Sequence, residues 1–170
     1  SMQKITMDGD QSIVLFKKEI TKILIEKGAD VKLTGDTPLH LATFKNHLEI
    51  AKCLIKHHAD INVVDKKGWA PLHISVENRL YNCKLLIEKG AHINAKTKYG
   101  HTALHRAVKK NTYKIIKLLI ENNADVNIKD NNGETALHFA TSKQSFKITE
   151  VLLENNANVN AIDRNKQTPL

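Results

Sequence analysis

Histidine is the residue whose repetition in this chain first suggests chemistry. The chain has 170 residues and nine histidines, of which four close related tetrapeptides of the type Thr-Pro-Leu-His: His40, His73, His105 and His138. Histidine is the commonest metal ligand and a frequent general acid or base. The even spacing predicts equivalent places in successive helical units, and packed helices lie about 8–10 Å apart. Zinc binds nitrogen ligands at roughly 2.0–2.1 Å, so neighbours in this row cannot share one ion.

Other residue types that could perform chemistry form no site either. Cys53 and Cys83 fall on apolar helical patterns and are interpreted as small buried hydrophobic residues. His57 and His58 form a local pair at an expected helix end, which is interpreted as a solvated cap. The chain contains no Gly-x4-Gly-Lys-Ser/Thr loop, no His-Glu-x-x-His and no Gly-x-Ser-x-Gly. The sequence therefore predicts no catalytic residue, no metal and no cofactor, and a protein that is not an enzyme.

The tetrapeptides return at a nearly constant interval, which identifies the elements that carry them. They begin at Thr37, Ala70, Thr102 and Thr135, and Thr168 begins a last incomplete copy, so the steps are 33, 32, 33 and 33 residues. Apolar residues at helical spacing run between these copies. Such self-similarity indicates stacked units of two short antiparallel helices followed by an extended turn.

The residue types at the ends of each unit fit this geometry. Thr37 can cap a helix N-terminus with its hydroxyl, and Pro38 then occupies the first helical position, where its missing N–H costs nothing. Ala70 lacks that hydroxyl, which should cost roughly 1 kcal/mol at its helix start. Helix ends that need left-handed dihedrals carry Gly28, His58, Gly90, Asn123 and Asn156.

Thr-Pro-Leu-His-x-Ala at 37–42, the Gly-Ala-Asp-Val-like segments and the 33-residue period together resemble the ankyrin repeat. The resemblance covers about residues 10 to 170. It implies an all-α ankyrin-repeat solenoid of stacked helix-turn-helix units with projecting β-hairpin-like fingers. It also implies one domain over residues 1–170, with a degenerate capping repeat at 2–36, repeats at 37–69, 70–101, 102–134 and 135–167, and the start of a further repeat at 168–170.

Three departures from the repeat pattern lead to separate expectations. The first finger, between Gly28 and Thr37, should be three residues short. The repeat that begins at Ala70 lacks one residue, which we place near Asn78–Leu80. A stack that ends at Leu170 would leave Val151, Leu152 and their neighbours poorly covered, so either the array continues beyond Leu170, which we favour, or the last turn folds back.

Composition bears on compartment and partner. No stretch of 18 apolar residues is present, and two cysteines without metal or redox spacing fit a reducing interior, so we expect the cytoplasm or the nucleus and leave secretion into a host cell open. The net charge of +8 suggests an anionic partner, but 23 of the 26 basic residues are lysine. Phosphate recognition favours the planar guanidinium of arginine. The chain is also rich in Asn (16) and Ile (17), which share A/T-rich codons with Lys, so we attribute much of the charge to a coding bias and keep nucleic acid or anionic lipid as a less favoured alternative.

The resemblance implies recognition of another protein by finger tips and inner helices. Trp69 is the only tryptophan, and with Tyr99 one finger along it is expected to form an aromatic pair; the competing interpretation is a local staple on the next finger. Arg106 replaces an apolar residue and could extend a basic patch in the groove. The predicted partner-binding residues are Lys66, Lys67, Trp69, Lys98, Tyr99, His101, Arg106, Lys109 and Lys110.

The expected partner is a segment of another protein, acidic with an apolar anchor, bound across residues 64–110 by a monomeric array. One alternative is that the array recruits substrates or targets for a larger enzyme or effector. Another is that the chain is itself a substrate, because the resemblance places an asparagine that is known to be hydroxylated at Asn62, Asn94, Asn127 and Asn160.

Overall fold

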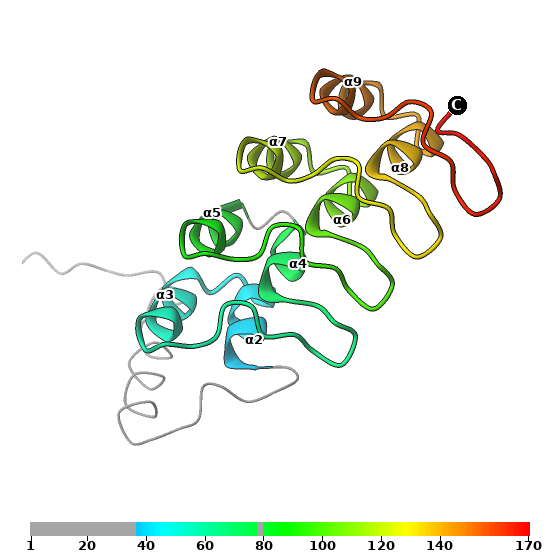
Figure 1. Cartoon of the computed structure of the whole chain (residues 1–170). Coiled ribbons are helices and arrows are strands. Elements are labelled where there is room, and N and C mark those ends of the chain that lie inside the picture. The colour runs from blue at the N-terminus through cyan, green and yellow to red at the C-terminus, as the bar shows by residue number, and fades with distance from the viewer. Residues whose placement is uncertain (1–36, 78–79) are drawn as a thin grey trace, which may run out of the picture.

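The computed structural model describes residues 37–77 and 80–170, and within them the regular structure is entirely helical. Figure 1 shows two parallel rows, with the even-numbered inner helices beside the projecting loops and the odd-numbered outer helices behind them. The predicted all-α solenoid is confirmed. The helices are α2 (Pro38–Phe44), α3 (Leu48–Lys56), α4 (Pro71–Ser75), α5 (Leu80–Glu88), α6 (Ala103–Lys109), α7 (Tyr113–Glu121), α8 (Ala136–Ser142) and α9 (Phe146–Glu154).

The inner helices begin as their capping residues predict. The Thr37 hydroxyl accepts from the His40 N–H at 3.4 Å, and Pro38 is the first residue of α2. Ala70 offers no side-chain acceptor, and α4 has five residues where α2, α6 and α8 have seven. The Thr135 hydroxyl makes no capping bond to the start of α8 either, and that helix keeps seven residues, so the absent hydroxyl at Ala70 does not by itself shorten α4.

The four repeated histidines connect each inner helix to the following loop. In each, Nδ1 accepts the backbone N–H of the residue that precedes the helix, at 3.1–3.3 Å. Nδ1 is then an acceptor, so Nε2 carries the proton and donates to a backbone carbonyl further along the chain. These acceptors are Trp69 O at 2.8 Å from His40, Ala95 O at 3.0 Å from His73, Glu134 O at 3.2 Å from His105 and Gln167 O at 3.3 Å from His138. Both ring nitrogens are used by the scaffold.

The loops that follow the outer helices are the fingers, defined here as residues 59–69, 91–101, 124–134 and 157–167. In the first finger Asp65 N donates to Trp69 O at 3.0 Å and Gly68 N donates to Asp65 O at 2.9 Å, and the same two bonds close the other three. Each finger also bonds to the next through the backbone, for example from Lys98 N to Lys67 O at 3.1 Å. The fingers are therefore hairpin-like and form a continuous ladder along the stack.

Left-handed backbone occurs where the residue types predicted it. The outer helices end with positive φ at His58, Gly90, Asn123 and Asn156. Gly100, with φ +79°, is needed for a second reason, because a Cβ there would lie 2.5 Å from Asn131 N on the next finger.

The missing residue of the second described repeat can be placed between its two helix starts. Ten residues separate the starts of α2 and α3, of α6 and α7, and of α8 and α9, but nine separate those of α4 and α5. Of the predicted position near Asn78–Leu80, residues 78–79 lie outside the described part of the chain, as do Gly28, the short first finger and the capping repeat at 2–36.

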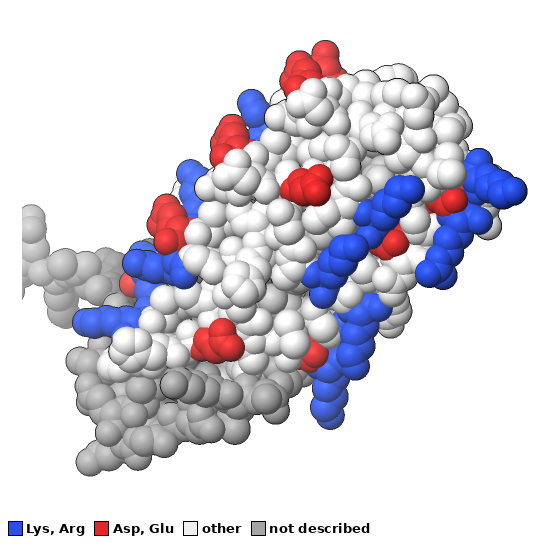
Figure 2. All heavy atoms as spheres, in the orientation of Figure 1, with Lys and Arg blue, Asp and Glu red and all other residues white. Residues whose placement is uncertain are grey.

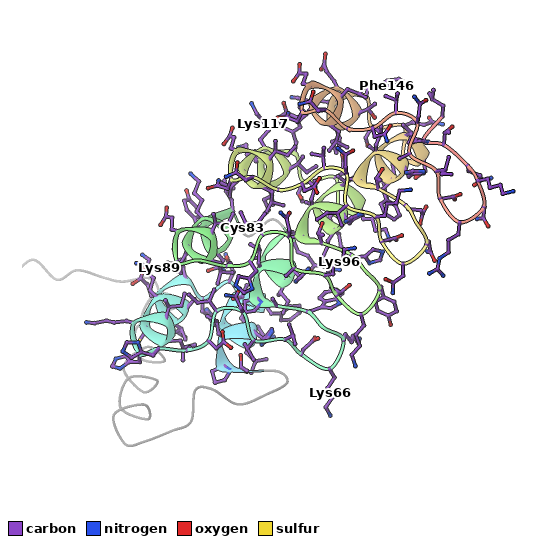
Figure 3. The ribbon with its side chains drawn as sticks, in the orientation of Figure 1. Lys66, Cys83, Lys89, Lys96, Lys117 and Phe146 are labelled. Carbon is purple, nitrogen blue, oxygen red and sulfur yellow. The ribbon has the colours of Figure 1, made fainter. Side chains whose placement is uncertain are left out.

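Leucine, isoleucine, valine and alanine from both helix rows form a core that runs through the stack. The expectation that Val151 and Leu152 would be poorly covered is wrong: they are 6% and 0% exposed. Both belong to the apolar core that runs through the stack, and α9 ends like the other outer helices, with Ala157 N donating to Leu152 O at 3.0 Å. The opposite face of α9 is the open one, with Phe146 86% exposed at the end of the stack (Figure 3).

No helix in the described residues is both long and apolar enough to cross a lipid bilayer.

Candidate binding surface

The residues predicted to bind a partner divide into two clusters on the side of the inner helices and fingers. One cluster is centred on Trp69 and joins the first finger to α4 and α6. The other is centred on His101 and joins the second and third fingers to α6 and α8. Lysines on the finger tips surround both.

Trp69 lies against a cation from the repeat after next. The Arg106 guanidinium carbon is 3.9 Å from the centre of the Trp69 ring, which is a cation–π stack. Glu77, in the turn that follows α4, accepts from Arg106 and lies 3.1 Å from Lys110 Nζ. The hydrogen bond from Lys110 is the main cause that lowers the pKa of the Glu77 carboxyl, with help from the Arg106 charge, so Glu77 stays ionised. Ion pairing and stacking thus hold the Trp69 cluster together.

A surface hollow of about 290 Å³ lies beside this cluster. Its apolar lining includes Leu41 and Phe44 of α2, which are 53% and 50% exposed. Two N–H donors of the cluster, Trp69 Nε1 and Arg106 Nε, are buried without a hydrogen-bond partner among the described residues. The full lining consists of His40, Leu41, Phe44, Asp65, Lys67, Trp69, Ile74, Glu77 and Arg106. We call this the Trp69 hollow.

The His101 cluster combines the Lys109 ammonium group, the Phe139 ring and the buried carboxylate of Asp130. Lys109 Nζ lies 3.1 Å from His101 Nε2 and 4.0 Å from the centre of the Phe139 ring. His101 Nε2 is also 3.2 Å from Asp130 Oδ2, whose carboxylate is almost fully buried. Burial and the Lys109 charge lower the pKa of His101, and Asp130 opposes that shift. Lys109 can donate to Nε2 only when that nitrogen carries no proton, whereas a hydrogen bond to Asp130 Oδ2 requires a proton on it, so His101 cannot bond to both neighbours in one protonation state.

The expected Trp69–Tyr99 aromatic pair is not formed. Tyr99 lies beside His101, with ring centres 6.2 Å apart, whereas Trp69 stacks on Arg106. The physical reason is that Arg106, which sequence reasoning assigned to an open basic patch, reaches back over Trp69 and is itself partly buried. The stacking partner of the ring lies on an inner helix and not on the neighbouring finger.

The nine predicted partner-binding residues leave out several contributors to the two clusters and the hollow, among them Leu41, Phe44, Glu77 and Phe139. Leu41 and Phe139 stand at the position equivalent to Arg106, and Glu77 stands at the position equivalent to Lys109. The signal that could have found them is therefore the column of equivalent positions on the inner helices, compared from repeat to repeat.

The remaining predicted lysines are free to meet a partner. Lys66, Lys67 and Lys98 are exposed on the finger turns, and Lys66 extends away from its finger in Figure 3. Figure 2 shows Lys and Arg gathered over the fingers, while acidic and basic side chains alternate along the edge of outer helices. No group of three or more potential metal ligands occurs in residues 37–77 and 80–170.

A family model described as "Ankyrin repeats (3 copies)" matches residues 13–97, 45–130 and 83–163. The chain is 47% identical over 45 residues to Ankyrin repeat domain-containing protein 13B of Mus musculus, a match that covers 26% of this chain and 7% of that protein. It is 36% identical over 67 residues to Inhibitor of Bruton tyrosine kinase of Mus musculus, covering 37% and 5%. It is 43% identical over 47 residues to Protein phosphatase 1 regulatory subunit 27 of Homo sapiens, covering 28% and 30%. The chain thus spans less than a third of each of these relatives.

Proposed function

Because this chain belongs to the ankyrin-repeat family, whose repeats generally mediate protein–protein interaction, we propose that it is a non-catalytic scaffold that binds a segment of another protein. The segment lies across residues 64–110 and contacts finger tips and inner helices. Its chemistry is acidic with an apolar anchor. Two of the relatives are named as an inhibitor of a kinase and as a regulatory subunit of a phosphatase, which agrees with a binding role.

The observation that supports this proposal is the juxtaposition of exposed apolar and cationic side chains that the stack does not need. Leu41 and Phe44 are about half exposed on α2, although their repeat neighbours Leu39 and Ala42 are buried. Exposed Lys66, Lys67 and Lys98 flank them on the fingers. Aromatic, apolar and Arg side chains at the centre of a surface, with charge around it, are typical of protein interfaces.

The proposed binding residues are those of both clusters and the finger tips. Trp69 and Arg106 act as one stacked unit, and Tyr99 with His101 forms a second aromatic contact. The lysines attract the acidic partner, and complementary charge mainly raises the association rate and selects the partner. The residues are Lys66, Lys67, Trp69, Lys98, Tyr99, His101, Arg106, Lys109 and Lys110.

Two charge-matched double variants within one repeat test this function. Lys109→Glu/Lys110→Glu changes the inner helix α6, and Lys114→Glu/Lys117→Glu changes the exposed face of the outer helix α7 by the same charge. Affinity capture from the native cell with wild type and both variants should show protein partners that the first variant loses and the second keeps.

Equal loss with both variants would contradict the proposal, because it would mean that net charge and not a surface drives binding. In that case recovery of nucleic acid or anionic lipid, lost steeply with added salt, would favour the alternative partner class.

A further inference from the structure

We propose, resting on the protein-binding function above, that the Trp69 hollow is the anchor site and takes one large apolar side chain from a partner segment that carries acidic residues on both sides of it. The partner class is thus an acidic peptide segment with a single bulky leucine-like or aromatic residue.

The size of the hollow supports a side chain as occupant. Its volume of about 290 Å³ is at the lower limit of pockets that hold small-molecule ligands, about 300–1,000 Å³. It opens at the surface beside the half-exposed Leu41 and Phe44. A side chain that removes these apolar groups from water gains about 25 cal/mol for each Å² buried, without the need for a closed cavity.

The walls of the hollow are stiff, which makes it a defined site. Arg106 is clamped between the Trp69 ring and the Glu77 carboxylate, and Glu77 is held a second time by Lys110. Trp69 is fixed through its backbone, because its N–H donates to Asp65 Oδ1 at 2.8 Å. A preformed wall lowers the ordering cost of binding.

The charges around the hollow select acidic neighbours for the anchor. Lys45 lies 5.5 Å from the centre of the Phe44 ring, Lys67 lines the hollow from the finger, and Lys110 stands beyond Glu77. Of the two acids of the lining, Glu77 is paired with Arg106 and Lys110, and Asp65 directs Oδ1 at the backbone N–H groups of Lys67 and Trp69 in its own turn. The rim therefore presents cations on several sides of an apolar floor, which complements carboxylates on both sides of an apolar residue.

Selection from a displayed library of random twelve-residue peptides against the full 170-residue chain tests this. Enriched peptides are then synthesised and their affinities measured by fluorescence anisotropy. The expected peptides carry one large apolar residue between acidic residues, and their affinity should fall at least tenfold with Phe44→Ala and with Leu41→Ser. Phe146→Ala, at a phenylalanine on α9 that is more exposed than Phe44, is the control and should leave affinity unchanged.

Two other outcomes of the peptide experiment would overturn the proposal that the Trp69 hollow is the anchor site. If enriched peptides bind Phe44→Ala and Leu41→Ser as well as wild type but lose affinity for Lys109→Glu/Lys110→Glu, the hollow is not the anchor site and the binding function stands. If no peptide is enriched above a sample without the chain, both the anchor site and the function fail. Circular dichroism of each variant confirms that its helices are intact.

Discussion

Arg106 shows how one residue is adapted to a neighbour two repeats away. The equivalent positions are the apolar Leu41, Ile74 and Phe139, and an unpaired cation there would be costly as it becomes partly buried. Stacking on Trp69 and pairing with Glu77 offset that cost. The planar guanidinium is suited to both contacts at once, which an ammonium group is not.

Arg106→Lys should therefore loosen the Trp69 cluster although it keeps the charge. We expect a loss of about 1 kcal/mol in the free energy of unfolding, from the weaker cation–π contact. Because Trp69 is the only tryptophan, its emission should also move to longer wavelength as water reaches the ring. Lys117→Arg on the outer face is the control; an unchanged emission maximum in Arg106→Lys would contradict the role of the stack.

Buried histidines should make the fold sensitive to acid. Burial lowers the pKa of His105 to about 4 and also lowers that of His73, against 6.5 for an exposed imidazole. Between these values the unfolded chain binds protons that the folded chain does not, so stability is full above pH 6.5 and falls as the pH drops toward 4. For His105 alone the loss amounts to about 3 kcal/mol at most.

Urea unfolding at pH 7.5, 6 and 5 measures this effect. The midpoint should fall over that series, and the fall should be smaller in His105→Gln, which is less stable at neutral pH but has lost the titrating group. An identical pH dependence in wild type and His105→Gln would show that His105 does not contribute.

At the scale of the element, α4 is the least supported of the described inner helices. It is the shortest, its N-cap is Ala70, and its repeat lacks one residue before α5. The helix persists because Leu72 and Val76 are fully buried and because His73 bonds at both ring nitrogens. Tertiary packing thus compensates for a weak local signal, as is usual for short helices.

Ala70→Thr should stabilise the chain by about 1 kcal/mol, because it restores the hydroxyl that caps α2 and α6. Ala70→Val adds a side chain of the same shape without the hydroxyl and serves as the control. Chemical unfolding midpoints compare the two: a gain for threonine alone supports the cap, and equal shifts for both would assign the effect to packing.

At the scale of the whole molecule, successive described repeats contact one another through helix packing and through the ladder of fingers, and the Trp69–Arg106 stack reaches one repeat further. Such an array presents one long surface whose chemistry changes along its length. In this chain the Trp69 hollow, with its exposed apolar residues Leu41 and Phe44, lies next along the surface to the lysines at the end of α6. Acidic and basic side chains alternate along the outer helices, whereas Lys and Arg gather over the fingers, so the finger side is the more cationic of the two (Figure 2).

If that cationic side serves a protein partner, nucleic acid should bind to it only weakly. We expect heparin and duplex DNA to dissociate at moderate salt, with similar salt dependence for Lys109→Glu/Lys110→Glu and Lys114→Glu/Lys117→Glu. Tight binding with a steep logarithmic salt slope, lost only in the α6 variant, would instead assign this surface to nucleic acid.

The periodic features of this protein could be read from its residues alone. Helix starts at Thr37 and Thr102, left-handed ends at Asn123 and Asn156, and the structural use of the histidine row were all predictable. Each depends on bonds within one repeat or on a contact that every repeat makes in the same way. Such local and repeated geometry follows from residue type and spacing.

Only the tertiary structure decided the features that join unlike residues of different repeats. Trp69 meets Arg106 and not Tyr99, Lys109 lies on Phe139, and Val151 is covered where exposure was expected. These contacts depend on the offset between successive inner helices and on how α9 packs against the helices before it, and no spacing within a single repeat encodes either. The scaffold is therefore determined by the sequence period, whereas the surface that a partner would meet is determined by the stack.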